Sequence, residues 1–206
     1  MSWKETSPDH IFGVTGVILA GGRSRRFGAN KALTTIGNTT LIERLIHTVQ
    51  PVFSQLLIVT NQPDDYKFLG LPMIEDRIKG FGPLGGIYSA LETINDDYAF
   101  VVACDMPDLN ASLIRLLVNL RKHFDVVVPR IDTWLEPLHA VYSKQCLDPI
   151  KILIDRGVRQ VFQFFDQVKV RYVDLWEMQE VDPDHCAFYN INTRKDLDEF
   201  LKKLKS

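Results

Sequence analysis

Residues 15–31 read TGVILAGGRSRRFGANK, and this stretch decides the fold. Thr15–Ala20 is a short run of aliphatic and β-branched residues, which predicts a buried strand. Gly21 and Gly22 end the run and open a loop that holds three arginines and a lysine. A buried strand that leads into a glycine-rich basic loop indicates an α/β protein with a phosphate site.

The rest of the chain repeats this alternation of strands and helices. Aliphatic runs predict further strands at 55–60, 72–75, 98–103, 125–129, 138–143 and 168–173. Apolar periodicity and capping residues predict helices at 40–53, 87–94, 111–123, 144–165 (broken at Gly157) and 193–205. Thr40 with Glu43, and Thr193 with Asp196, have the spacing of capping boxes.

This order of elements predicts the fold class. Strands separated by helices are typical of an α/β protein with a mostly parallel, Rossmann-like sheet and helices on both faces. We expect a single domain over residues 14–206 after a flexible leader at residues 1–13. In such sheets ligands bind outside the carboxyl ends of the strands, so the strand exits are the places to search for chemistry.

The bulk composition argues against several classes of protein. The 206 residues carry a formal net charge of -2, without the basic excess that nucleic acid or an anionic membrane favours. No stretch approaches the roughly 20 apolar residues of a membrane span. Three cysteines and five histidines are dispersed, without disulfide or metal-ligand spacing. We expect a cytoplasmic protein that acts on small molecules.

The loop at 21–31 is the first candidate site. Glycines let the backbone approach a phosphate, and Arg26 and Lys31 are among the cations that would bind it. A solvated basic loop is the alternative, but a position directly after a buried strand favours phosphate. The loop matches neither G-x-x-x-x-G-K-[ST] nor G-x-G-x-x-G. We expect Arg26, beside apolar Phe27, to face the phosphates and Arg23 to be solvated.

Carboxylates follow two other predicted strands. Asp105, in Cys104-Asp105-Met106-Pro107, is well placed to bind Mg²⁺, although a turn-forming role before proline is the alternative. Asp76 follows the strand at 72–75 and is a candidate for a ribose or metal-water contact, or again a turn former.

Two further motifs precede predicted helices. Gly82–Gly86 could bind an anion at a helix N-terminus or serve only as a tight loop. In Asn190-Ile191-Asn192-Thr193 both asparagines point to one side if the segment is extended. They are candidates for a pterin or second-metal site, or for local backbone hydrogen bonds.

Taken together, these motifs resemble those of the molybdenum cofactor guanylyltransferase family. The segments that carry the resemblance are LAGGRSRRFGANK at 19–31, GPLGG at 82–86, CDMP at 104–107, EPLHAVY at 136–142 and NINT at 190–193. The resemblance extends over about residues 15–200. It implies a Mg²⁺-dependent transfer of GMP from GTP to molybdopterin that carries molybdenum, which gives molybdopterin guanine dinucleotide and pyrophosphate. It also implies transient contacts with molybdenum insertion proteins and with molybdoenzymes.

The resemblance assigns roles to individual residues. It implies that Leu19, Ala20 and Gly21 contact the nucleotide, Lys31 its phosphates, and Asp105 the Mg²⁺ ion, with Asp76 in the nucleotide site. Phe27, Asn30 and Val59 stand where the family often has methionine, aspartate and asparagine. A guanine or ribose contact made by that asparagine is either missing in this chain or supplied by Asn61.

Other substrates and other activities fit parts of the pattern. The nearest alternatives are a cytidylyltransferase for the same pterin and a sugar-1-phosphate nucleotidyltransferase. Gly22 favours guanine because it leaves room for a large purine. A catalytically silent nucleotide-binding regulator is disfavoured because Lys31 and Asp105 are both present. A nicotinamide-dependent oxidoreductase is disfavoured because its glycine fingerprint is missing.

Overall fold

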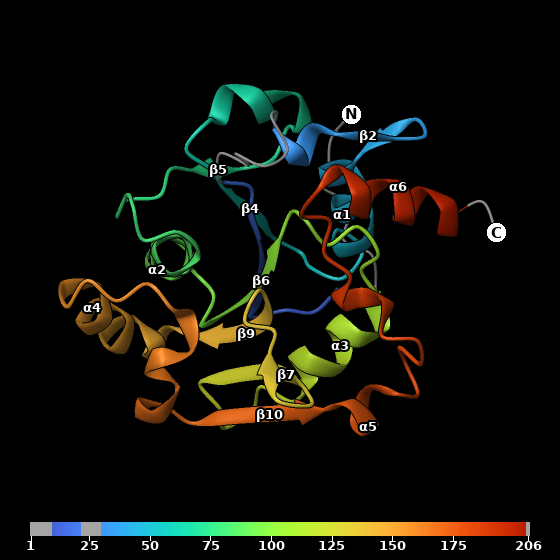
Figure 1. Cartoon of the computed structure of the whole chain (residues 1–206). Coiled ribbons are helices and arrows are strands. Elements are labelled where there is room, and N and C mark those ends of the chain that lie inside the picture. Colours follow the sequence, from blue (N-terminus) through green and yellow to red (C-terminus); the bar gives the residue numbers. More distant parts are fainter. Residues whose placement is uncertain (1–9, 22–29, 205–206) are drawn as a thin grey trace.

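The protein, seen here in a computed structural model that describes residues 10–21 and 30–204, is built on one large mixed sheet (Figure 1). The sheet has eight strands in the order β10-β7-β9-β6-β1-β4-β5, and β8 pairs with β7. The strands are β1 Val14–Leu19, β4 Leu56–Val59, β5 Met73–Ile74, β6 Tyr98–Ala103, β7 Val126–Ile131, β8 Trp134–Leu135, β9 His139–Ser143 and β10 Val170–Asp174. A separate two-stranded ribbon is formed by β2 Thr35–Ile36 and β3 Thr39–Thr40.

The direction of the strands locates the site. β1 pairs in parallel with both β4 and β6, and β10 pairs in parallel with β7. β9 lies between β6 and β7 and is antiparallel to both. β7 therefore points the same way as β6, and the carboxyl ends of the five longer parallel strands reach one edge of the sheet. The predicted fold class is confirmed, and β8 and β9 are its antiparallel members.

Helices cover both faces of the sheet, as predicted. They are α1 Leu41–Val49, α2 Pro83–Thr93, α3 Ala111–Asn119, α4 Leu147–Asp155, α5 Leu175–Met178 and α6 Arg194–Lys203. Figure 1 shows α2 and α4 on one side of the strands and α1 and α3 on the other. In β1, Val14 and Ile18 belong to the hydrophobic cluster of α1 and α3, and Val17 to that of α2 and α4. Period-2 alternation of a buried strand thus supplies both layers of core.

The helix starts follow their capping residues. Thr40 and Thr193 form the predicted capping boxes with Glu43 and Asp196, and Asn110 accepts hydrogen bonds from the first turn of α3. The prediction for α2 was wrong in its start. α2 begins at Pro83 rather than at residue 87, because proline suits the first position of a helix and Gly82 supplies the positive φ of 60° before it.

The helix ends and the two terminal regions differ from the expected ranges. α1 stops at Val49, and the expected helix over 144–165 is α4 between two 3-10 segments, Lys144–Cys146 and Val161–Gln167. Gly157, with φ +76°, breaks this region where predicted. Of the expected leader, residues 1–9 lie outside the described residues, whereas Ile11 already pairs with Phe53.

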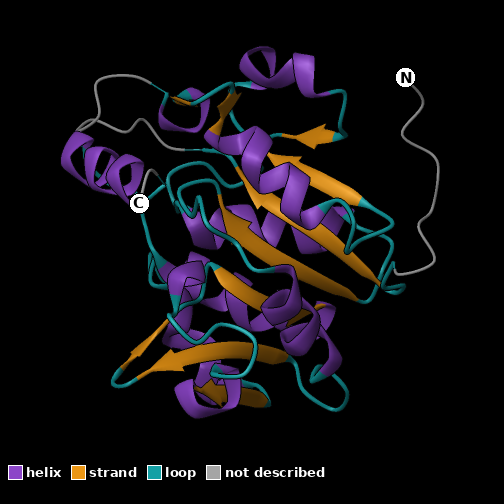
Figure 2. Cartoon of the chain, turned by 90° about the vertical axis from the view of Figure 1, so that its right-hand side faces the viewer, coloured by secondary structure: helices purple, strands orange, loops and turns teal. Residues whose placement is uncertain are grey.

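The described elements form one layered body, which Figure 2 shows from the side with helices packed around the twisted sheet. α6 contributes to a third, smaller hydrophobic cluster, in which Phe200 lies with Ile191 and with Leu41, the first residue of α1. Within residues 10–21 and 30–204, no helix combines the length and the apolar character needed to cross a bilayer.

Candidate active site

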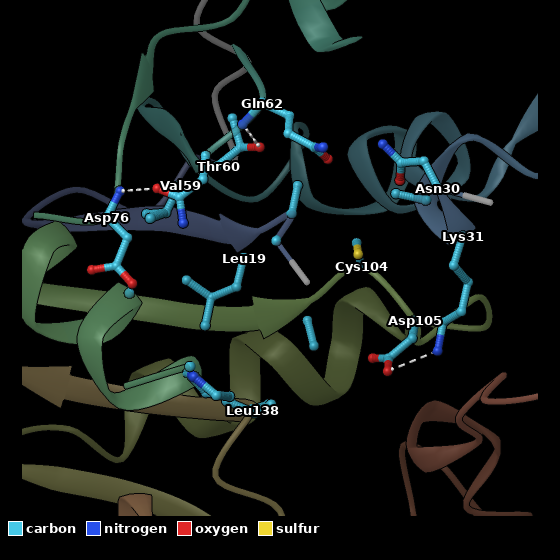
Figure 3. A pocket seen from close by; sticks show the side chains of 18 of the residues that line it. Leu19, Asn30, Lys31, Val59, Thr60, Gln62, Asp76, Cys104, Asp105 and Leu138 are labelled. Atoms are coloured by element: carbon cyan, nitrogen blue, oxygen red, sulfur yellow. Dashed lines mark hydrogen bonds and ion pairs between the residues drawn. The ribbon is translucent and has the colours of Figure 1, made fainter. Parts of the chain in front are cut away.

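A cavity of about 540 Å³ opens at the carboxyl edge of the sheet (Figure 3). It collects residues from the exits of β1, β4 and β6, from the start of α2 and from the segments before α1 and α6. The lining residues that carry predicted roles are Leu19, Ala20, Gly21, Asn30, Lys31, Asn61, Asp76, Asp105 and Asn192. The structure therefore brings together, in one cavity, residues separated by up to 173 positions.

One end of the cavity is a charged cluster. Lys31 Nζ lies 3.1 Å from Asp105 Oδ2 and donates a second hydrogen bond of 3.2 Å to Asn192 Oδ1. Lys31 is buried, with 8% of its surface exposed, and Asp105 is partly buried. Figure 3 shows the lysine and the aspartate reaching toward each other from separate segments. The predicted phosphate lysine and the predicted metal ligand are thus direct neighbours.

The donor set at this end fits a hard divalent cation. Asp105 Oδ1 is buried and has no hydrogen-bond partner among the described residues. Asn192 adds an amide oxygen, and oxygen ligands of these two kinds suit Mg²⁺. Within residues 10–21 and 30–204, no group of three or more His, Cys, Asp or Glu side chains forms a metal cage. A cation held here would take further ligands from water or from substrate phosphates, which is how Mg²⁺ usually binds.

The other end of the cavity is built around Asp76. This carboxylate is 7% exposed, and its Oδ1 accepts hydrogen bonds from Ser89 Oγ at 3.1 Å and from the backbone N–H of Ile78 at 3.0 Å. The backbone N–H of Asp76 donates to Asn61 Oδ1 at 3.2 Å. Figure 3 shows Asp76 across the cavity from Lys31 and Asp105. Asp76 and Asn61 are therefore fixed together, far from the charged cluster.

Val59, which stands where the family often has asparagine, changes the chemistry of the cavity wall at that position. Val59 presents an apolar side chain to the cavity, and two residues further Asn61 brings an amide into the wall. The described chain thus offers an asparagine close to the position where the resemblance expects one. Its contact with a nucleotide stays a prediction.

Asn30 joins the basic loop to the 3-10 helix Pro63–Leu69. Its Nδ2 donates to Asp65 Oδ2 at 3.0 Å, and its Oδ1 accepts from the Tyr66 hydroxyl at 3.1 Å. Tyr66 is buried, and burial raises the pKa of its hydroxyl to about 12, so it stays a hydrogen-bond donor at neutral pH. The amide thus ties the residue before Lys31 to a neighbouring element.

The two asparagines of the NINT segment lie in different environments. Asn192 lines the cavity, whereas Asn190 donates from Nδ2 to the backbone carbonyl of Phe188 at 3.2 Å and also hydrogen-bonds Glu136. Glu136 is buried, and this burial raises its pKa to about 7, with the negative charge of Asp105 adding to the effect. The geometry gives Asn192 a direct place in the cavity and Asn190 a place behind it.

The cavity offers no activated thiol. Cys104 lines it, but burial raises the pKa of this thiol to about 12, with a further contribution from the charge of Asp105. Asp105 and Lys31 therefore act beside a neutral thiol. Four residues that sequence analysis singled out, Gly22, Arg23, Arg26 and Phe27, lie outside the described residues.

Sequence reasoning missed several residues of the cavity wall. Thr60, Gln62 and Tyr66 line it without having been singled out, and Leu138 was named only as part of the EPLHAVY segment. Thr60 and Gln62 follow a predicted strand, so the rule about strand exits could have found them. Tyr66 lies in a short 3-10 helix, and this kind of helix has no periodic pattern to reveal which side faces the cavity.

Comparison with known proteins identifies the class of enzyme to which this chain belongs. The model of the MobA-like NTP transferase domain matches residues 16–171, so this chain is a nucleotidyltransferase. A molybdenum cofactor guanylyltransferase from Desulfosudis oleivorans is 37% identical over 195 residues, which are 94% of this chain and 96% of the relative. A probable molybdenum cofactor guanylyltransferase from Pelotomaculum thermopropionicum is 39% identical over 89% of each chain. The chain belongs to the molybdenum cofactor guanylyltransferase family.

A solved structure supports the same assignment. Molybdopterin-guanine dinucleotide biosynthesis protein A from Archaeoglobus fulgidus superimposes with a TM-score of 0.82 at 26% identity. The match covers 93% of this chain and 98% of the other. The two chains therefore share their fold over nearly their whole lengths.

Proposed function

We propose that this protein transfers GMP from GTP to molybdopterin, with or without molybdenum already bound, and releases pyrophosphate. The observation that carries the proposal is the cluster of Lys31, Asp105 and Asn192 at one end of the cavity. A cation and oxygen ligands side by side are what a triphosphate with its metal requires. Membership of the guanylyltransferase family supplies the choice of nucleotide and acceptor.

The length of the cavity suggests how GTP would lie. The phosphates would face Lys31 and Asp105, and the nucleoside would extend toward Asp76 and Asn61 at the opposite end. Leu19, Ala20 and Gly21 would form the wall between the two ends. Gly22, which lies outside the described residues, stays a proposed nucleotide contact. Gly21 has no side chain that could hold a purine away from the backbone.

The chemistry asks for positioning and charge neutralisation. The terminal phosphate of the acceptor is anionic, so its attack on the α-phosphorus needs no general base. Lys31 would stabilise charge on the phosphates, and Arg26 is the further cation that we propose for this role. Asp105 and Asn192 would hold Mg²⁺, which supplies additional neutralisation of the transferring phosphates.

The direct test presents the protein with molybdopterin, Mg²⁺ and each of the four nucleoside triphosphates, and measures pyrophosphate. We expect release with GTP and little with the others. Preferred use of CTP would favour the cytidylyltransferase alternative. Release with a sugar 1-phosphate in place of molybdopterin would favour the sugar nucleotidyltransferase alternative.

The first predicted variant is Asp105→Asn, which keeps the shape and removes the charge that would bind the metal. We expect a loss of at least 100-fold in turnover, on the order of 3 kcal/mol of transition-state stabilisation, with an unchanged circular dichroism spectrum. Asp65→Asn is the matched control, because Asp65 is an exposed carboxylate whose amide replacement can still accept the hydrogen bond from Asn30. Near-normal turnover by Asp105→Asn would remove this residue from the site.

The product also suggests where the protein works. A pterin dinucleotide is useful only to enzymes that bind it as a cofactor, so we propose transient contacts with molybdenum insertion proteins and with molybdoenzymes, in the cytoplasm. Co-purification with such proteins, under conditions in which the product is made, is the measurement that tests these contacts.

A further inference from the structure

Lys31 occupies the position between two oxygen ligands. Its ammonium contacts Asp105 Oδ2 at 3.1 Å and Asn192 Oδ1 at 3.2 Å, and these oxygens come from two distant segments of the chain. A lysine ammonium is a compact point charge that hydrogen-bonds several oxygens at once. The chain thus places a cation of its own where Asp105 and Asn192 would hold a metal.

Because the site is partly buried, a divalent ion cannot easily share it with the Lys31 ammonium. Lys31 is 8% exposed and the side chain of Asp105 is 25% exposed, so solvent screens their charges only in part. A divalent ion entering beside an unmoved ammonium would meet direct charge repulsion, which is strong in a partly buried site. The ion would also find Asp105 Oδ2 and Asn192 Oδ1 already in use as hydrogen-bond acceptors, so that of these three oxygens only Asp105 Oδ1 lacks a partner among the described residues.

The neighbouring charges hold the ammonium where it is. Asp105 is its ion-pair partner. The pKa of Asp196, at the start of α6, is lowered chiefly by hydrogen bonds from the backbone of Asn192 and Thr193, and Lys31 adds a smaller electrostatic contribution. Glu136, which interacts electrostatically with Asp105, is a buried acid whose raised pKa reduces its negative charge at neutral pH. Asp76 lies at the other end of the cavity and is bound to Ser89.

We propose that Lys31 is a resident counter-ion that keeps the metal position closed until a triphosphate draws its ammonium away. The inference rests on the proposed function, because the triphosphate is the anion that competes for the lysine. Its long flexible stem lets the ammonium move toward phosphate oxygens while the backbone stays in place. Asp105 and Asn192 then become free to bind the cation, so metal enters with the nucleotide rather than before it.

The test measures Mn²⁺ binding to the nucleotide-free protein by electron paramagnetic resonance, with Mn²⁺ as the probe. Lys31→Met keeps the volume of the stem and removes the charge. We expect this variant to bind Mn²⁺ at least tenfold more tightly than the unmodified protein does. Lys31→Ala should show the same gain and serves as a second variant if the methionine disturbs folding, which circular dichroism would show.

Lys151→Met is the matched control. Lys151 pairs with Asp155 on α4, so its removal also frees a carboxylate, but away from the cavity. We expect no gain in Mn²⁺ binding from it, and we expect Asp105→Asn to cancel the gain of Lys31→Met in the double variant. Equal Mn²⁺ affinity of the unmodified protein and both Lys31 variants would overturn the proposal.

The two proposals can fail separately. If the Lys31 variants gain no metal affinity while the unmodified protein still transfers GMP, the counter-ion inference falls and the proposed function stands. If the variants gain affinity through Asp105 and no nucleoside triphosphate yields pyrophosphate, the proposed function falls and the counter-ion role stands.

Discussion

At the scale of single residues, Asn30 shows how a departure from a family pattern is accommodated. The resemblance expects an aspartate here in many relatives. In this chain the amide donates to Asp65 Oδ2 and accepts from the Tyr66 hydroxyl, so it uses both of its polar atoms. An aspartate would face the carboxylate of Asp65 with like charge. The asparagine and Asp65 therefore form a matched pair.

This pairing predicts a rescue. Asn30→Asp should lower the catalytic efficiency three- to tenfold, because repulsion from Asp65 and the lost hydrogen bond together cost roughly 1 kcal/mol and displace the residue before Lys31. Asp65→Asn alone should have little effect, since an amide oxygen still accepts from Asn30. The double variant should regain most of the lost efficiency. Steady-state kinetics of all four proteins checks the cycle, and absence of rescue would separate Asn30 from Asp65.

The sequence predicted the functional residues that follow the strands, but it did not reveal the residues that hold them in position. Asp105 follows β6 directly, and Lys31 belongs to the segment that follows the neighbouring parallel strand β1, so the rule about strand exits brings them to the same edge of the sheet. Tyr66 and Asp65 escaped because the 3-10 helix that carries them has no apolar period, and its docking depends on contacts far along the chain.

At the scale of elements, the start of α2 decides between two readings of the GPLGG motif. Gly85 lies in the first turn of the helix, and a Cβ atom there would come within 2.7 Å of the Ile78 carbonyl oxygen and 2.9 Å of Asp76 Oδ2. The glycine is therefore required for the close approach of α2 to the segment that carries Asp76. An anion at this helix start is not needed to explain it.

Gly85→Ala should therefore disturb both stability and the Asp76 end of the cavity. A backbone carbonyl cannot move as a side chain can, so we expect a loss of about 1–3 kcal/mol in the free energy of unfolding and a raised Michaelis constant for GTP. Gly86→Ala is the control, because its Cβ would meet the movable Leu19 Cδ2 at 3.1 Å. Thermal denaturation and GTP kinetics distinguish them, and equal effects of the two variants would contradict the packing argument.

At the scale of the whole molecule, the sequence predicted the class of sheet better than its order. Aliphatic runs located the strands, and alternation with helices indicated a parallel α/β arrangement. These patterns could not predict that β9 lies antiparallel between β6 and β7, because strand order is set by contacts between distant segments. This insertion brings Glu136 and Leu138, just before β9, to the edge where β6 delivers Asp105.

The same insertion buries two titratable groups with opposite effects on stability. Glu136 has its pKa raised to about 7 from an ordinary value of 4.5, and His139 has its pKa lowered to about 3 from 6.5, both chiefly by burial. Each group therefore prefers its neutral form in the folded protein. Both ring nitrogens of His139 lack hydrogen-bond partners among the described residues, and the ring packs edge-on against Phe100 and Phe188.

The signs of the two effects follow from linkage. The stability that depends on neutral Glu136 is fully present below pH 4.5, and it is lost as the pH rises through about 7. For His139 the unfolded chain binds the extra proton, so stability is present above pH 6.5 and falls as the pH decreases toward 3. Each shift corresponds to several kcal/mol at most, since one pKa unit is worth about 1.4 kcal/mol.

Two substitutions should each remove one of these contributions to the pH dependence of the free energy of unfolding. Glu136→Gln keeps an acceptor for Asn190 and cannot ionise, so its free energy of unfolding should decline less than that of the unmodified protein between pH 5 and pH 8. His139→Leu removes nitrogens that lack partners and cannot take up a proton, so it should resist acid between pH 6 and pH 4. Urea denaturation across this range gives the free energy directly. Each variant is the control for the other: Glu136→Gln should leave the slope below pH 4.5 unchanged, and His139→Leu should leave the slope above pH 6.5 unchanged. A profile in which either substitution shifts the free energy by the same amount at every pH would mean that the residue does not titrate in this way, because only a group whose proton affinity changes on folding alters the slope.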